Sequence, residues 1–343
     1  MLQRLSNGRN NREWSWMMVT INDIAKEAGV AKSTVSRYLN NGSVSPRTKQ
    51  KIDEIVKKRG YKPNTFARSL KAQKTNMIGV IIPRLDSPST NEVLSGIDSS
   101  AHEKGYQLII TNANQEKERE IEDIYTLAKQ KVDGIIFLAK EITAEHQIAI
   151  NDIKLPFLVL GQQTDNIPSI VHDDYGAGKK IARHALELGH KEFLYFTVSK
   201  EDKAVGQDRY NGFMDEINKA TDTVIQAVET SFTMREAYKT AIKELQGLEA
   251  SFVIGATDTI ALAVLKAAAE LGLSVPEDVS VAGYGGYNLL SFMTPALTTI
   301  KYPYYTIGDM AIATIEKMIL KETVPQTQTL SNELIIKETT QSI

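Results

Sequence analysis

The stretch that most constrains this chain is VTINDIAKEAGVAKSTVSRYLN, which occupies residues 19–40. Its apolar residues lie at the spacing of two short helices, and Gly29 stands between them, where a residue without a Cβ readily adopts positive φ. The second helix would turn Val35 and Leu39 toward a core and leave a row of short polar and basic side chains facing outward. That arrangement is typical of a helix-turn-helix, whose second helix lies in the major groove of DNA.

The side chains expected to contact DNA lie on both helices. Base contacts are predicted for the second helix, at Lys32, Ser33, Thr34, Ser36 and Arg37, since the N-terminal part of such a helix reaches base edges. Lys32 and Arg37 can donate to guanine O6 and N7. Near the first helix, Thr20 and Asn22 are expected to contact phosphate, which sets the register without reading sequence. Each residue alone would be interpreted as solvated helix surface, but together in this motif they favour DNA binding.

A third helix is predicted over residues 44–59, with Ser45 as its N-cap and Pro46 at its first helical position. With this helix the chain resembles the lac/gal repressor family of bacterial transcription regulators. The resemblance is carried by residues 19–40, by the KxxGYKPN run at 57–64 and by ARSL at 67–70, and it extends to about Glu338. It implies an all-α helix-turn-helix head over residues 18–63, and a regulator in place of an enzyme.

The resemblance also implies that residues 64–76 form a hinge that becomes helical only on the operator. Leu70 matches the family residue that wedges into the minor groove, Ala67 matches the residue that reads the groove edge, and Asn64 is expected to contact DNA. A helix this short is marginal in isolation, so its formation can be coupled to DNA binding. The alternative is that Leu70 is an ordinary linker residue.

The charge of the chain is divided unevenly. Residues 18–77 hold 13 Lys and Arg against 4 Asp and Glu, whereas residues 78–343 hold 24 against 37. A basic head on an acidic core suits a polyanion that binds at one end only. The chain has no Cys, no apolar run of the roughly 18 residues that a membrane span needs, and no apolar stretch in residues 1–17, which are interpreted as a disordered extension. We therefore expect a cytoplasmic protein.

From residue 77, short apolar runs alternate with helical patterns, which predicts parallel sheets covered by helices on both faces. Residues 77–338 are too many for one such sheet, so two α/β lobes with a cleft between them are expected. The resemblance implies the same architecture, a two-lobed, periplasmic-binding-protein-like core of doubly wound sheets that dimerises and binds a small effector between its lobes. By that resemblance the chain crosses between lobes near residues 175, 303 and 332. Residues 320–343 show no leucine heptad, so we expect a homodimer and not a tetramer.

Loops that follow predicted strands hold the candidate effector ligands, because open α/β sheets bind ligands beyond the carboxyl ends of their strands. These candidates are Arg84, Asp86, Ser87, Gln162, Arg209, Thr257, Asp258 and Tyr302. Arg84 begins RLDS, a context that resembles the trehalose-type repressors of the family and implies a phosphate clamp; a surface pair with Asp86 is the alternative. Arg209 matches a family Arg that holds sugar hydroxyls, and Asp258 is either an effector ligand or the N-cap of a helix.

Several segments indicate which sugar is involved. GVIIPRLDS (79–87), HDDYGAG (172–178) and AVGQDR (204–209) look like segments of the sucrose-operon repressors of low-GC Gram-positive bacteria. That resemblance implies control of sucrose genes, and Arg84 favours a phosphorylated effector such as sucrose 6-phosphate. A trehalose- or maltose-type regulator of the same family is the alternative, with trehalose 6-phosphate as the nearest rival effector. Gly285 stands where many members carry Asp, which removes an acceptor for hydroxyls and weakens the transfer of any one sugar.

Signatures of enzymes are lacking, since the sequence contains neither GxxxxGK[ST] nor GxSxG. The five His are scattered without zinc-binding spacing, and the densest cluster, His172-Asp173-Asp174, is interpreted as ordering a lobe crossing and not as holding a metal. Neither a metal nor a cofactor is predicted. A solute-binding protein without a regulatory role would share the core but would not need the basic head, so that alternative is disfavoured.

Overall fold

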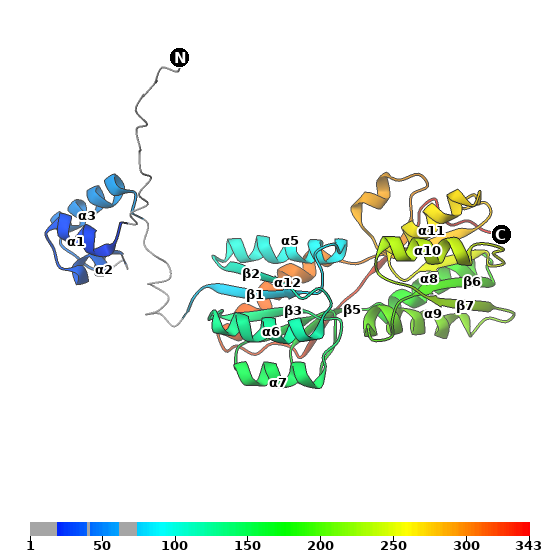
Figure 1. Cartoon of the computed structure of the whole chain (residues 1–343), viewed down its shortest axis with the longest axis horizontal. Coiled ribbons are helices and arrows are strands. Elements are labelled where there is room, and N and C mark those ends of the chain that lie inside the picture. Colours follow the sequence, from blue (N-terminus) through cyan, green and yellow to red (C-terminus); the bar gives the residue numbers. More distant parts are fainter. Residues whose placement is uncertain (1–18, 40–41, 62–73) are drawn as a thin grey trace, which may run out of the picture. The chain divides into compact units, whose positions relative to one another are not determined.

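The computed structural model describes residues 19–39, 42–61 and 74–343. The chain divides into two compact units, and the boundary in the sequence lies between Thr75 and Asn76. The described part of the first unit is helical, and the second unit holds two β-sheets with helices on both faces (Figure 1). Within the described ranges, no helix is long and apolar enough to cross a membrane.

Three helices make up the described part of the first unit: α1 (Ile21–Ala28), α2 (Lys32–Leu39) and α3 (Pro46–Arg59). Thr20 caps α1, since its hydroxyl accepts the Asp23 N–H at 3.3 Å while the Asp23 carboxylate accepts the Thr20 N–H at 2.8 Å. Gly29 ends α1 in the left-handed conformation, with φ of 63°, and so permits the turn into α2. Ser45 caps α3 and Pro46 is its first residue, which confirms the prediction for this helix.

A small apolar core joins these helices. Its buried members come from all three of them: Ile24, Ala25, Ala28, Val35, Ile52 and Ile55. Helices as short as the 8 residues of α1 and α2 are marginal alone, so this mutual packing is what stabilises them. An ion pair between Arg59 Nε and Glu27 Oε2, at 2.8 Å, adds a surface contact between α3 and α1.

The first lobe of the second unit contains a parallel sheet in the order β11-β5-β4-β3-β1-β2. Its strands are β1 (Met77–Ile82), β2 (Gln107–Asn112), β3 (Gly134–Leu138), β4 (Phe157–Leu160), β5 (Ser169–His172) and β11 (Thr327–Leu330). Helices α5 (Pro88–Glu103) and α12 (Tyr304–Ile319) cover one face, and α6 (Lys117–Lys129) and α7 (Ala144–Ile153) cover the other (Figure 1). Neighbouring side chains of β1 point to opposite faces of the sheet. Val80 packs with α5 and α12, and Ile81 packs with α6 and α7.

The second lobe contains a sheet in the order β12-β10-β9-β8-β6-β7. Strands β6 (Glu192–Thr197), β7 (Val224–Glu229), β8 (Phe252–Gly255), β9 (Ser280–Gly285) and β10 (Thr298–Lys301) are parallel, while β12 (Glu333–Ile335) runs antiparallel to β10. Its elements also include α8 (Asp174–Glu187), the π-helix η1 (Lys203–Asp208), α9 (Arg209–Ile217), α10 (Met234–Glu244), α11 (Asp258–Glu270) and the 3₁₀ helix η2 (Asn288–Phe292). The predicted two-lobed, doubly wound α/β fold is confirmed, and β12 is an antiparallel exception that the pattern did not predict.

Three segments connect the lobes. The chain enters the second lobe after β5, at His172–Asp174, and returns after β10, at Tyr302–Pro303. It crosses again between β11 and β12, at residues 331–332. Residues that follow β1, β3 and β4 in the first lobe and β8 in the second line one shared space, so the carboxyl ends of these strands face the junction.

Candidate effector cavity and nucleic-acid interface

Helix α2 presents a polar, basic surface. Lys32, Ser33 and Arg37 are exposed, Thr34 and Ser36 are partly exposed, and only Val35 is fully buried. The helix carries no acidic residue, so it holds no charge that would repel phosphate. Tyr38 of α2 donates a hydrogen bond to Asp53 of α3, which fixes the helix to the rest of the head. The side chains predicted to contact bases therefore lie on the accessible part of a small, well-anchored helix.

The two residues predicted to contact phosphate differ in what their side chains do. Thr20 donates its hydroxyl hydrogen to Asp23 Oδ2 at 2.6 Å as part of the cap of α1, whereas Asn22 is exposed in the first turn. Their phosphate contacts stay predictions. Asn64, Ala67 and Leu70 of the predicted hinge, and the extension over residues 1–17, lie outside the described residues.

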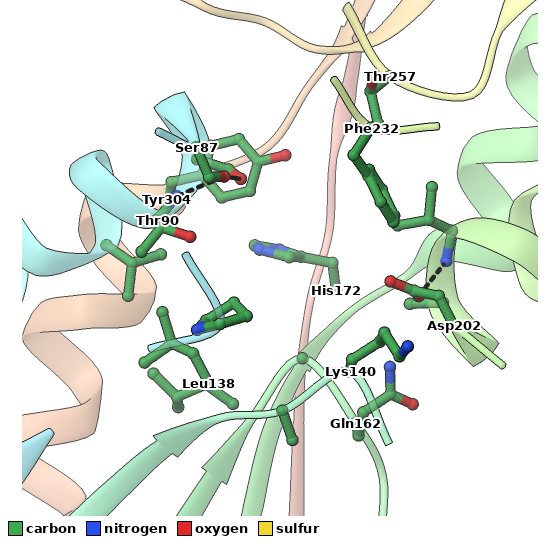
Figure 2. Close-up of a pocket in the computed structure, with 18 of the residues that line it drawn as sticks. Ser87, Thr90, Leu138, Lys140, Gln162, His172, Asp202, Phe232, Thr257 and Tyr304 are labelled. Atoms are coloured by element: carbon green, nitrogen blue, oxygen red, sulfur yellow. Dashed lines mark hydrogen bonds between the residues drawn. The ribbon is translucent and has the colours of Figure 1, made fainter. Parts of the chain in front are cut away.

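A cavity of about 190 Å³ lies between the two lobes of the core (Figure 2). Five of the eight predicted effector residues line it: Arg84, Ser87, Gln162, Arg209 and Thr257. The other three, Asp86, Asp258 and Tyr302, do not line it. Residues that were not predicted as effector ligands also contribute to the polar and aromatic wall, among them Lys140, His172, Asp202, Phe232, Tyr287 and Tyr304.

Arg84 lines the cavity and also contacts Asp86, while its role as a phosphate clamp stays a prediction. Its side chain is only 14% exposed, and its Nε lies 3.7 Å from Asp86 Oδ1, while Asp86 itself points to solvent with 71% of its side chain exposed. The Arg84 guanidinium also lies 5.3 Å from the centroid of the Phe232 ring, which belongs to the second lobe. Arg84 is therefore a cavity residue whose guanidinium extends from the first lobe to the second. Asp86, on the solvent side of Arg84, forms an ion pair with it.

Arg209 is held in one orientation by buried partners. Its Nε donates to Asp174 Oδ1 at 2.7 Å, and its Nη1 donates to the Ala256 carbonyl oxygen at 2.7 Å. The Tyr302 hydroxyl donates to the same Asp174 oxygen at 2.9 Å. The side chain of Tyr302 is buried, and its hydroxyl positions Asp174. Tyr302 therefore supports the cavity wall indirectly and is not itself part of the wall. The structure does not place Tyr302 among the cavity residues, contrary to its selection as an effector ligand.

Asp258 is also committed to the protein interior. It is fully buried, and its two oxygens accept hydrogen bonds from Thr299 Oγ1 at 2.5 Å and from the Gly286 N–H at 2.6 Å. Burial raises the pKa of Asp258 to about 6, and these hydrogen bonds act in the opposite direction. The N-cap of α11 is Thr257, whose hydroxyl accepts the Ile260 N–H, so the alternative of Asp258 as N-cap is wrong. The reason is backbone conformation, which is extended at Thr257 and helical from Asp258 onward.

Gly285 lies against the buried carboxylate of Asp258. A Cβ at Gly285 would lie 2.7 Å from Asp258 Oδ2, at the end of β9. A side chain there would collide with the Asp258 carboxylate, and a second carboxylate would also repel it. The absence of a side chain at Gly285 therefore leaves room for the buried carboxylate of Asp258.

Another part of the cavity wall carries a carboxylate and an ammonium. Asp202 faces the cavity (Figure 2), and its Oδ1 accepts the Val205 N–H at 2.9 Å. Burial raises the pKa of Asp202 to about 6, while the positive charge of Lys140 acts in the opposite direction. Lys140 Nζ, from the first lobe, lies 3.2 Å from Glu201 Oε2 of the second lobe, so this ion pair bridges the lobes beside the cavity.

The same strand-end rule that selected Arg84 could have found three of the residues that were missed. Lys140 follows β3, Asp202 follows β6 and Phe232 follows β7. Their residue types alone did not distinguish them from surface loop residues. Within the described ranges, no group of three or more His, Asp or Glu side chains is arranged to hold a metal ion.

Comparisons with known proteins agree with both the helix-turn-helix head and the two-lobed core. Residues 20–64 match the model for bacterial regulatory proteins of the lacI family, and residues 182–340 match that for a periplasmic binding protein-like domain. The chain is 38% identical over 310 residues to a sucrose operon repressor of Staphylococcus xylosus, which covers 90% of this chain and 96% of the relative. It is 32% identical to catabolite control protein A of Priestia megaterium, over 90% of this chain and 95% of that protein.

A solved structure extends the similarity to the whole architecture. The lac repressor dimer bound to operator and the anti-inducer ONPF aligns with a TM-score of 0.86 at 25% identity. The alignment covers 94% of this chain and 99% of that chain. A helical head of this type and a two-lobed core therefore occur together, in the same order, in a structure that contains DNA.

Proposed function

Since the chain belongs to the lacI family of bacterial regulatory proteins, we propose that it represses sucrose-utilisation genes and leaves its operator when a sugar or sugar phosphate fills the cavity. DNA binding as a repressor is the activity of the family, whose members are transcription regulators and not enzymes. The observation that carries the proposal for this chain is the full-length similarity to a sucrose operon repressor, together with a head that presents α2. The protein would act in the cytoplasm, where its operator is.

The DNA-binding half acts through a homodimer. Two copies of α2 related by a two-fold axis read a palindromic operator whose half-sites lie about one helical turn apart, ~34–36 Å. Lys32, Ser33, Thr34, Ser36 and Arg37 would supply base contacts, and Thr20 and Asn22 phosphate contacts. The excess of Lys and Arg in residues 18–77 makes the affinity depend on salt, because phosphate neutralisation releases counterions.

The cavity supports a sugar as the effector. It mixes a ring surface at Phe232 with hydroxyl, amide and charged groups at Ser87, Gln162 and Asp202. The Arg84 guanidinium supports a phosphate on that sugar, because a guanidinium binds phosphate through paired, charge-assisted hydrogen bonds. The start of α5 adds to this, since Ser87 caps that helix and helix N-termini favour anions. Sucrose 6-phosphate fits this chemistry, and a trehalose- or maltose-type effector is the alternative.

Effector binding would act on DNA through the hinge at residues 64–76. A sugar that contacts both lobes changes the angle between them at the three crossings. This change separates the hinge segments of the two subunits, and operator binding becomes weaker as a result. Couplings of this kind are about 1–3 kcal/mol. Leu70→Ala is expected to lower operator affinity without changing sugar affinity, and an unchanged operator affinity would contradict the hinge.

The direct test uses the full chain and an operator selected from random palindromic DNA. Fluorescence anisotropy measures operator affinity while sucrose, sucrose 6-phosphate and trehalose 6-phosphate are titrated in turn. We expect sucrose 6-phosphate to release the DNA at the lowest concentration. Release by trehalose 6-phosphate alone would replace sucrose with the trehalose alternative, and the absence of any sequence-specific DNA binding would refute the repressor function.

A further inference from the structure

Of the described residues that line the cavity, two carry carboxylates, Asp174 and Asp202, and their hydrogen bonds differ. Asp174 is buried, and its Oδ1 accepts hydrogen bonds from Arg209 Nε at 2.7 Å and from the Tyr302 hydroxyl at 2.9 Å. Asp202 is only partly buried, and its Oδ1 accepts one hydrogen bond, from the Val205 N–H at 2.9 Å. Asp174 is therefore committed to the protein, whereas Asp202 is committed through one oxygen only.

The second carboxylate oxygen of Asp202 is accessible from the cavity. No described residue donates a hydrogen bond to it, and Figure 2 shows it turned toward the open space. The buried side-chain atoms that lack a partner in the described ranges lie elsewhere, on Thr111, His172, Tyr195 and Tyr284. A ligand in the cavity can therefore reach this oxygen directly.

The cations around Asp202 are paired with other carboxylates. Lys140 Nζ lies 3.2 Å from Glu201 Oε2, and Arg209 Nε lies 2.7 Å from Asp174 Oδ1. Within the described part of the chain, neither cation forms an ion pair with Asp202. The negative charge of Asp202 is therefore available to a ligand that donates hydrogen bonds.

The local structural role of Asp202 accounts for only one of its oxygens. Asp202 is the N-cap of η1, and a cap needs a single acceptor, which Ser, Thr or Asn supplies without a charge. A carboxylate is costly to desolvate, and burial raises the pKa of Asp202 to about 6. The group is still ionised near neutral pH, where it accepts hydrogen bonds and cannot donate them. It therefore binds hydroxyl groups and repels a phosphate.

We propose that the accessible oxygen of Asp202 accepts a hydrogen bond from a hydroxyl of the effector, which places the effector's phosphate toward Arg84 and its hydroxyl toward Asp202. The proposal rests on the proposed sugar-binding function and adds the orientation of the sugar to it. Arg84 follows β1 of the first lobe and Asp202 follows β6 of the second, so one effector contacts both lobes through opposite charges. A sugar without a donor at this point leaves the carboxylate desolvated and unpaired, and is bound less tightly for that reason.

The test removes the charge of Asp202 and keeps the cap of η1. Asp202→Asn retains an oxygen for the Val205 N–H, and Asp202→Ser is a second variant that retains the cap with a hydroxyl. Asp208→Asn is the matched control, because it removes a carboxylate from the same π-helix at a position that does not line the cavity. Calorimetry of the full chain measures affinity for sucrose and sucrose 6-phosphate. Anisotropy measures operator binding without sugar, and thermal unfolding checks the fold.

For Asp202→Asn we expect sucrose affinity to fall about 10- to 100-fold, as for a lost hydrogen bond to a charged group. The loss for sucrose 6-phosphate should be smaller, because removal of a negative charge also favours the phosphate. Operator affinity without sugar should not change, and Asp208→Asn should bind both sugars as the wild type does. If Asp202→Asn destabilises the core, the same losses are expected of Asp202→Ser.

Wild-type sucrose affinity in a folded Asp202 variant overturns the proposal. It does so even if the variant binds sucrose 6-phosphate more tightly, since Asp202 would then act only by repelling phosphate. Should the wild type bind sucrose 6-phosphate alone, a loss in Asp202→Asn that is absent from Asp208→Asn supports the proposal, and no loss overturns it. If the wild type binds neither sugar, the proposed function itself fails.

Discussion

Arg209 and Asp174 form a buried ion pair, with Nε 2.7 Å from Oδ1, that ties the start of α9 to the start of α8. The close packing of the two helices permits this contact, since a Cβ at Gly178 would lie 2.0 Å from the Arg209 carbonyl oxygen. The hydroxyl of Tyr302 donates to the same carboxylate. Asp174, at the end of the first crossing, therefore positions both the cavity residue Arg209 and Tyr302 of the second crossing.

Asp174→Ala should destabilise the core by about 3–5 kcal/mol, because it leaves the Arg209 guanidinium buried without its counter-charge. Urea unfolding of the full chain measures the loss. Arg183→Ala is the matched control, since Arg183 forms an ion pair with Glu216 at the surface with 55% of its own side chain exposed. It should leave the unfolding free energy nearly unchanged. If both variants unfold at the same urea concentration, the ion pair of Arg209 does not have the structural role described here.

Arg84→Ala should weaken binding of a phosphorylated sugar about 10- to 100-fold and change the affinity for the unphosphorylated sugar much less, because the guanidinium is assigned to the phosphate. Arg84→Lys should recover part of the loss, since an ammonium keeps the charge but loses the paired geometry. Calorimetry with sucrose and sucrose 6-phosphate decides the matter. Equal losses for both sugars would assign Arg84 to the hydroxyls or to packing on Phe232 instead.

Arg37→Ala should lower operator affinity by about 1–3 kcal/mol and relax the preference for one base pair, because Arg37 is exposed on α2 and assigned to a base edge. The affinity for sugar should not change. Lys58→Ala tests whether any lost positive charge has this effect, since Lys58 lies in the last turn of α3 with 77% of its side chain exposed. A selection of operator variants that is identical for wild type and Arg37→Ala would rule out base reading by Arg37.

Asp258 should make the stability of the core depend on pH. Its folded pKa is raised to about 6 from a reference of 3.8, so the folded state holds the proton more tightly than the unfolded state. The stabilising contribution is therefore complete below about pH 4 and is lost as the pH rises to about 6. The full loss corresponds to about 3 kcal/mol, by the free energy of one pKa unit. The difference in unfolding free energy between wild type and Asp258→Asn should change over this range, whereas a constant difference would refute the raised pKa.

The head shows how far local sequence rules reach. Thr20, Gly29, Ser45 and Pro46 act on neighbouring backbone groups, and each of these effects depends on residues within one helical turn. The three helices could therefore be predicted with their turn and with the face that α2 exposes. The alternation of apolar runs and helical patterns likewise predicted parallel sheets, because runs such as those of β1 and β3 are buried on both faces.

The cavity shows where such rules stop. Asp258 follows a strand and begins a helix, which made it both a ligand candidate and an N-cap candidate, yet its oxygens bond Thr299 and Gly286, 41 and 28 residues away. Phe232 and Lys140 looked like surface loop residues, but each reaches the junction between the lobes. Which strand-end residues face the cavity and which face the interior depends on how two sheets are placed, and no local pattern contains that placement.

By itself, then, the sequence determined the helix-turn-helix, the family and the two-lobed class of fold, because caps, turns and hydrophobic periodicity act between near neighbours. The tertiary structure alone decided the cavity wall. It placed Arg84 beside Phe232, paired Arg209 with Asp174, and buried Asp258 and Tyr302 behind the cavity wall. It also left Nδ1 of His172 without a hydrogen-bond partner in the part of the chain that the structure describes. These relationships join residues that are distant in the chain, within the second lobe for Arg209 and Asp258 and across the two lobes for Arg84 and Phe232.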